Sequence, residues 1–314
     1  MRYYSIKESY KKGYFSVGQG HKIYYERYGN PKGIPAVFIH GGPGSHFQEK
    51  HKRMFNPKVF DVLFFDQRGA GKSKPIGELR NNTTTHLVND INLLLDKFHI
   101  DKALIVGGSW GSTLALVYAI RNPKRVTGLA LRGVFLGTKE EERHVFGGGV
   151  ESFVPEEWKR FIELVPKEHR NNPIKYCWLQ IKSSDKKKRD LYIKEMHYFE
   201  SSLMALRDSK AKTKAKFKDW KFSKDMLVYP YYMIESCFLP DKYIENNLDK
   251  LKGIPTYIVQ GKYDLVCPPI GAYKVHKGIP KSILKLVVES HSISEPEGKQ
   301  TVITQMKWFE KKLK

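Results

Sequence analysis

The most informative stretch of this sequence is Val106-Gly107-Gly108-Ser109-Trp110-Gly111-Ser112. It contains the pattern G-x-S-x-G, which typically places a serine in a tight turn between a strand and a helix. The apolar run at residues 102–106 predicts a buried parallel strand before the turn. Residues 112–120 predict a helix after it, ending before Pro123. We therefore expect the hydroxyl of Ser109 above the edge of a sheet, although a glycine-rich structural turn would share this pattern.

The rest of the chain repeats the alternation of strand and helix. Short apolar runs that end in polar or glycine-rich turns predict further strands, and residues 83–95 and 299–313 carry apolar side chains at helical spacing. A hairpin at residues 14–28 is expected before them. Because the strands are apolar throughout, we predict an α/β fold with a mostly parallel sheet and helices on both faces. The predicted strands are residues 36–39, 62–65, 126–131, 255–260 and 282–288.

The alternation stops between residues 137 and 251. Helical patterns and charge clusters fill this segment, so we interpret it as a helical cap inserted into an α/β core of residues 1–136 and 252–314. Within the cap, residues 210–224 form a lysine-rich stretch with interleaved aromatic side chains. A solvated, partly amphipathic segment explains this stretch more simply than a nucleic-acid surface does.

The composition bounds the class of protein. The chain has 314 residues, 40% of them apolar, which is enough for one large domain with an insertion. Its net charge of +22 comes mostly from lysine without any nucleic-acid motif, so we expect no nucleic-acid partner. Cys177, Cys237 and Cys267 are scattered and indicate neither a disulfide framework nor a metal site. No apolar run could span a bilayer and residues 1–8 do not resemble a signal peptide, so we expect a cytoplasmic protein without a membrane partner.

Three residues with complementary chemistry follow three different predicted strands: Ser109, Asp264 and His291. The carboxyl ends of parallel strands are where open α/β sheets place their sites, and the order Ser, Asp, His is that of α/β hydrolases. His291 would accept the serine proton and later return it to the leaving group, while Asp264 would orient the histidine. Each residue alone could be an ordinary turn or surface residue, but their joint placement favours catalysis.

Two backbone N–H groups are expected to bind the oxyanion that such a reaction creates. One belongs to Trp110, directly after the serine. The other belongs to Gly42 in the loop His40-Gly41-Gly42-Pro43-Gly44, which follows a predicted strand. A glycine-rich loop in this place leaves backbone N–H groups free to point at a ligand. We interpret His40, which precedes the loop, as structural.

These residues lie in stretches that resemble the proline iminopeptidase (prolyl aminopeptidase) family of the α/β-hydrolase fold. The proline-containing glycine loop, the Asp-Gln-Arg-Gly turn and Gly-Gly-Ser-Trp-Gly form a fairly specific combination, whereas G-x-S-x-G alone does not. The resemblance covers nearly the whole predicted core. It implies removal of an N-terminal residue, preferentially proline, from peptides with a free N-terminus, without a metal or cofactor. The matching stretches are residues 40–44, 66–73, 107–115, 131–135, 261–269, 291–292 and 295–297.

The resemblance also implies which residues bind the substrate. Glu200 and Glu235 stand at positions where the family has cap carboxylates that hold the substrate amine. Phe135 stands at a position that lines the pocket for the proline ring in the family. Carboxylates hold a protonated amine through charge-assisted hydrogen bonds. Met196 and Phe199 stand where the resemblance leads one to expect tryptophans, so the aromatic wall of the pocket is altered.

Three functions remain to be separated. The leading one is a serine aminopeptidase. An esterase or amidase on the same core, acting on a non-peptide substrate, would have no use for Glu200 and Glu235 facing the serine. A non-catalytic protein drawn to nucleic acid by its charge would have no need of Ser109, Asp264 and His291. The oligomeric state is not indicated by the sequence.

Overall fold

The computed structural model describes residues 3–207, 209–292 and 296–314, so Glu295 of the last matching stretch lies outside the described residues. At the centre is an eight-stranded sheet with the order β1-β2-β4-β3-β5-β6-β7-β8. β2 is antiparallel to both β1 and β4, and all other neighbours are parallel. This confirms the predicted fold class. The strands are β1 (Lys11–Ser16), β2 (Lys22–Gly29), β3 (Ile34–Ile39), β4 (Phe60–Phe65), β5 (Ala103–Ser109), β6 (Val126–Val134), β7 (Thr256–Gly261) and β8 (Ile283–Val287).

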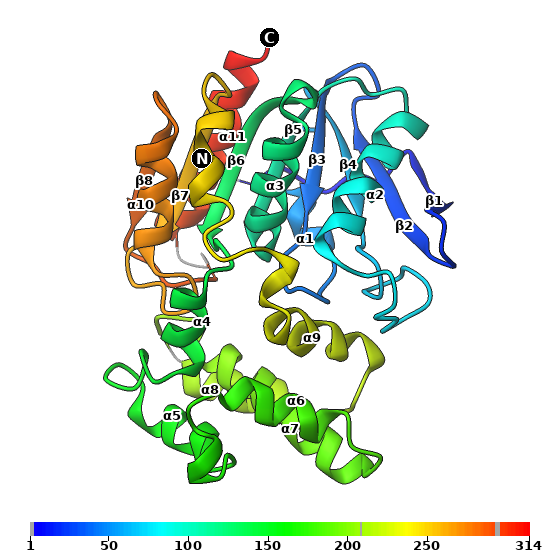
Figure 1. Ribbon diagram of the computed structural model, residues 1–314. Helices are drawn as coiled ribbons and strands as arrows, with labels where there is room; N and C mark the ends of the chain where they lie inside the picture. The colour runs from blue at the N-terminus through cyan, green and yellow to red at the C-terminus, as the bar shows by residue number, and fades with distance from the viewer. Residues whose placement is uncertain (1–2, 208, 293–295) are drawn as a thin grey trace.

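Both faces of the central strands are buried, which explains why these strands are apolar throughout. In β3, Val37 and Ile39 belong to one hydrophobic cluster with residues of α2, α3 and α10. Ala36 and Phe38 point to the other face and cluster with residues of α11. Figure 1 shows α2 and α3 in front of the sheet. The helices of this core are α1 (Glu49–Lys52), α2 (Thr84–Lys97), α3 (Trp110–Arg121), α10 (Pro269–Gly278) and α11 (Pro296–Lys312).

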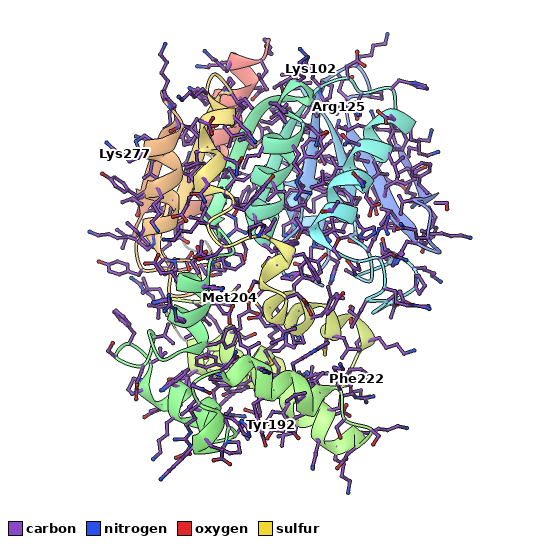
Figure 2. The ribbon with its side chains drawn as sticks, viewed as in Figure 1. Lys102, Arg125, Tyr192, Met204, Phe222 and Lys277 are labelled. Atoms are coloured by element: carbon purple, nitrogen blue, oxygen red, sulfur yellow. The ribbon has the colours of Figure 1, made fainter. Side chains whose placement is uncertain are left out.

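The segment between β6 and β7 is helical and lies at one end of the sheet (Figure 1). Figure 2 shows Lys102 and Arg125 at the opposite end, and these residues directly precede β5 and β6. The carboxyl ends of the parallel strands therefore face the inserted helices. These helices are α4 (Lys139–Phe146), α5 (Pro155–Ile162), α6 (Pro173–Ile181), α7 (Lys186–Leu203), α8 (Ser209–Phe217) and α9 (Val228–Ile234).

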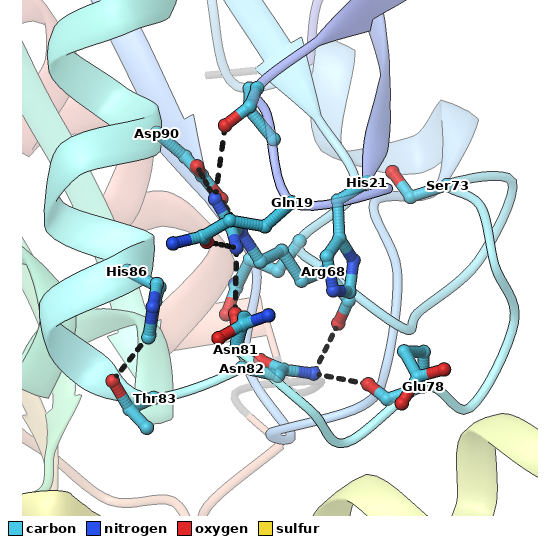
Figure 3. A network of polar contacts seen from close by, with 12 residues as sticks. Gln19, His21, Arg68, Ser73, Glu78, Asn81, Asn82, Thr83, His86 and Asp90 are labelled. Carbon is cyan, nitrogen blue, oxygen red and sulfur yellow. Dashed lines mark hydrogen bonds and ion pairs between the residues drawn. The ribbon is translucent and has the colours of Figure 1, made fainter.

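A buried ion pair fastens the turn after β4 to α2 (Figure 3). Arg68 donates to both carboxylate oxygens of Asp90 at 2.7 Å each, and both side chains are almost completely buried. Asn82 donates to the carbonyl of Arg68 at 3.0 Å and accepts from the hydroxyl of Tyr232, on α9, at 3.1 Å. This network therefore ties an inserted helix to the core.

The strands and core helices predicted from the sequence are present, with shifted boundaries. The helix after the serine begins at Trp110, two residues before its predicted start, because Ser109 itself is the N-cap. Among the described residues, no helix is long and apolar enough to cross a membrane.

Candidate active site

Ser109 occupies a strained turn between β5 and α3. Its φ is 58° and its ψ is −133°, and such conformations of non-glycine residues are uncommon and concentrate at functional sites. A Cβ on Gly107 would lie 2.2 Å from the carbonyl oxygen of Gly111. A Cβ on Gly111 would lie 2.3 Å from the carbonyl oxygen of Ile39 in β3. Both positions therefore require glycine for the turn to pack against the sheet.

The structure brings Ser109, His291 and Asp264 together at the carboxyl ends of β5, β8 and β7. The Oγ of Ser109 lies 2.9 Å from Nε2 of His291, and Nδ1 of His291 lies 2.8 Å from Oδ2 of Asp264. Asp264 and His291 are buried, whereas Ser109 is half-buried. A carboxylate acceptor beside Nδ1 places the ring proton there and leaves Nε2 able to accept the serine proton. This is the arrangement of a nucleophile, its base and an orienting carboxylate.

Asp264 is held in a single orientation by surrounding donors. Its Oδ1 accepts the backbone N–H groups of Val266 at 3.0 Å and Cys267 at 2.8 Å. Its Oδ2 accepts the side-chain amide of Gln260 at 3.1 Å in addition to His291. The carboxylate oxygens are thus satisfied without water, as a buried polar group requires.

Gly42 and Trp110 supply free backbone donors next to the serine. Trp110 lies in the first turn of α3, where N–H groups have no intrahelical acceptor. Within the described chain, the N–H of Gly42 donates no hydrogen bond. The glycine loop approaches closely, since a Cβ on Gly41 would lie 3.3 Å from the Cβ of Ser109. Gly42 has a φ of 120°, and a Cβ there would lie 2.7 Å from the backbone nitrogen of Ser45.

Side-chain hydrogen bonds connect the glycine loop to the turn that carries Ser109. Gln67 accepts from the indole of Trp110 at 2.8 Å and donates to the carbonyl of His40 at 2.9 Å. The backbone N–H of Gln67 donates to Nε2 of His40 at 3.0 Å, so the ring proton sits on Nδ1, 2.8 Å from the carbonyl of Gly41. Burial lowers the pKa of His40 to about 4, which keeps the ring neutral. His40 therefore holds the loop in place.

Two cavities meet at Ser109. The first, which we call the large cavity, has a volume of about 1050 Å³ and is lined by His291, the glycine loop and many residues of the inserted segment. The second, which we call the apolar recess, is much smaller. Its wall includes Phe135, Phe146 and Met233, together with the glutamates Glu141, Glu142 and Glu200. The residues that line both cavities are Gly42, Ser109, Glu200 and Tyr229.

Glu200, on α7, places a carboxylate where the two cavities meet. Burial raises the pKa of Glu200, while the charge of His291 and a hydrogen bond from Tyr229 oppose that rise. Glu200 and His291 both line the large cavity. Phe135 lies in the wall of the recess, so Ser109, Glu200 and Phe135 share one space.

Glu235 is not brought to this space. It follows the last residue of α9, its side chain is exposed, and it lines neither cavity. Glu235 is the C-cap of α9, so the placement of this helix sets the direction of its side chain, and the chain turns away beyond it, where Ser236, Cys237 and Phe238 all have positive φ. The expectation for Glu235 therefore does not match its position in the structure.

Comparison with known proteins gives the family. Residues 35–292 match a family described as having the alpha/beta hydrolase fold. The chain is 38% identical to the proline iminopeptidase of Arabidopsis thaliana over 93% of this chain and 78% of that protein. It is 36% identical to the proline iminopeptidase of Neisseria gonorrhoeae over 93% of this chain and 94% of that protein. The chain belongs to the proline iminopeptidase family. The crystal structure of an esterase from Rhodococcus sp. ECU1013 superimposes on this chain with a TM-score of 0.66 and 18% sequence identity. The match covers 96% of this chain and 99% of the esterase, and at this identity it shows only that the fold is shared.

For this member of the proline iminopeptidase family, sequence reasoning assigned no role to three residues that contact the site. Gln260 donates a hydrogen bond to Asp264, and Gln67 connects Trp110 to the glycine loop. Tyr229 donates a hydrogen bond to Glu200. The sequence offers one indication of a role for Gln260, because a polar amide stands near the end of a mostly apolar strand. Over the residues with described positions, no cluster of three or more His, Cys, Asp or Glu side chains could hold a metal ion.

Proposed function

We propose that the protein is a serine aminopeptidase that releases the N-terminal residue of a peptide, preferentially proline, through an acyl-enzyme. One observation carries this proposal: Ser109, which is hydrogen-bonded to His291 and through it to Asp264, lines the apolar recess together with the carboxylate of Glu200. A nucleophile beside a pocket that offers a carboxylate suits a substrate with a free amine at its end. We also propose that residues 137–251 act as the cap that forms this pocket.

In the proposed reaction, the N-terminal residue enters the recess with its amine at Glu200. Ser109 Oγ attacks the carbonyl carbon while its proton passes to Nε2 of His291. The N–H groups of Gly42 and Trp110 stabilise the oxyanion. His291 then gives the proton to the leaving nitrogen, the C–N bond breaks, and the released residue remains as an ester on Ser109. Water, deprotonated by His291, hydrolyses that ester and frees the amino acid.

The recess supports a preference for a compact, apolar first residue. Its free volume is about 30 Å³, and Phe135, Phe146, Val145 and Met233 contribute to its wall. Met233 can adjust this wall to the residue that enters, because its unbranched side chain has three rotatable bonds. We expect larger first residues to be poor substrates.

The proposal also covers location. Cys177, Cys237 and Cys267 are all free and buried. Free thiols suit a reducing compartment, so we propose that the enzyme works in the cytoplasm.

The test is a substrate panel with the purified protein. Proline arylamide should have the highest kcat/KM among aminoacyl arylamides, leucine and phenylalanine arylamides should be poorer, and N-acetylproline arylamide should be poor. A protein that hydrolysed small aryl esters but no free-amine arylamide would be an esterase, and the aminopeptidase proposal would fail.

A further inference from the structure

The position of His291 assigns the two cavities to the two halves of a substrate. His291 lines the large cavity and does not line the apolar recess. The group that protonates the leaving nitrogen must reach it within hydrogen-bond distance. The peptide that leaves therefore lies in the large cavity, and the first residue lies in the recess. At about 1050 Å³, the large cavity has room for several residues of that peptide.

One wall of the large cavity comes from the lysine-rich stretch of the cap. Residues 210–224 contain seven lysines and one aspartate, a net charge of +6 in fifteen residues, against +22 for the whole chain. Lys216 and Lys221 of this stretch line the cavity together with Phe217 and Trp220. Figure 2 shows Met204, another lining residue, at the level where the inserted helices meet the sheet. The positive charge is thus concentrated where the leaving peptide lies.

The facing walls add further positive charge. Lys50, on α1, Arg53, directly after α1, and Lys299, on α11, line the same cavity. Arg132 also lines it, beside His291. Arg132 donates to the carbonyl of His291 at 3.0 Å. The described lining contains six lysines and arginines against three carboxylates, Glu200, Asp219 and Asp225. Glu200 is already committed to the amine in the proposed function.

We propose that the large cavity selects peptides that carry carboxylates just after the scissile bond. This inference rests on the proposed function and adds to it a preference for the leaving peptide. The carboxylates can be acidic side chains at the second and third positions or the C-terminal carboxylate of a short peptide. Positive charge in a cleft raises both the local concentration and the binding of such anions. Each exposed charge pair changes binding by about 1.4- to 5-fold, so two pairs give a preference of roughly 2- to 30-fold at low salt.

The experiment compares three tripeptides by kcat/KM at low ionic strength. Pro-Glu-Glu-amide tests acidic side chains, Pro-Gln-Gln-amide is the neutral reference, and Pro-Gln-Gln with a free carboxylate tests the C-terminus. We expect the neutral reference to be the poorest of the three. The preference should shrink at about 0.5 M salt, because exposed charges are screened there.

Paired variants separate the cavity wall from the general charge of the protein. The cavity pair is Lys216→Gln with Lys221→Gln, and the control pair is Lys214→Gln with Lys218→Gln. The control pair removes the same charge from the same stretch, but these two lysines do not line the cavity. We expect the ratio of acidic to neutral peptide to fall severalfold in the cavity pair and to stay within about 1.5-fold of the parent in the control pair.

Two results would overturn this inference. One is an equal kcat/KM for all three peptides in the parent protein at low salt. The other is an equal fall of the ratio in both paired variants, which would assign the effect to the overall field. The proposed function fails separately, if the parent hydrolyses no proline arylamide, because that substrate carries no charge on its leaving group.

Discussion

Replacing Glu200 by glutamine tests how the protein would recognise a free N-terminus. The change keeps the size of the side chain and removes its charge. Glu200 lines both cavities beside Ser109, and its pKa responds to the charge of His291. A charge-assisted hydrogen bond contributes about 1.5–3 kcal/mol, so kcat/KM for proline arylamide should fall by roughly 10- to 150-fold. A small neutral aryl ester has no amine to bind, and its rate should hardly change.

The same substitution should not damage the fold. Burial raises the pKa of Glu200, which means that the surroundings disfavour its charged form. A neutral glutamine therefore removes an unfavourable burial of charge, and the melting temperature should be maintained. Glu235→Gln is the matched control, because it makes the same chemical change at an exposed residue that lines neither cavity. Equal losses on ester and arylamide, or a loss in Glu235→Gln as large as in Glu200→Gln, would refute this account of amine recognition.

Three further predictions concern the framework that positions the site. Arg68→Leu leaves the buried carboxylate of Asp90 without its partner, so urea titration should show a loss of about 3–5 kcal/mol, with a smaller loss when Asp90→Asn is added. Burial raises the pKa of Glu141 from 4.5 to about 7. Between pH 4.5 and pH 7, the folded protein therefore keeps a proton on Glu141 that the unfolded chain has released. The free energy of unfolding should therefore fall by up to about 3 kcal/mol as pH rises from 4.5 to 7, and Glu141→Gln should abolish this part of the fall. Gly111→Ala would press a methyl group against the carbonyl of Ile39, so thermal unfolding should show a loss of at least about 1–3 kcal/mol, and an unchanged melting temperature would contradict the close packing.

The core was predictable because its signals are local. Ser109 lies in a turn whose glycines are required by contacts that any such turn makes, and Asp264 and His291 follow apolar strands that had to be parallel. Gln260 was not predictable as the partner of Asp264, since a glutamine at the end of a strand can serve many roles.

The helical segment between β6 and β7 was predictable only in outline. Glu200 and Glu235 were named because of a resemblance, yet only Glu200 lines the cavities at Ser109. The direction of Glu235 depends on how α9 packs over the sheet, and a helical pattern in the sequence does not show that. Helix pattern alone could not show that Lys216 and Lys221 line the large cavity whereas Lys214 and Lys218 do not, because that placement depends on how the inserted helices pack over the sheet.

The central claim is that Ser109 is the nucleophile of an aminopeptidase. The most direct measurement is the rate of proline arylamide hydrolysis by purified Ser109→Ala beside the parent, with circular dichroism to show that both are folded. The substitution removes only the hydroxyl that lies 2.9 Å from His291. We predict that the variant folds like the parent and loses at least about 1,000-fold in kcat, as loss of a nucleophile that acts with its base implies. A folded variant that retained half of the parent's rate would contradict the claim.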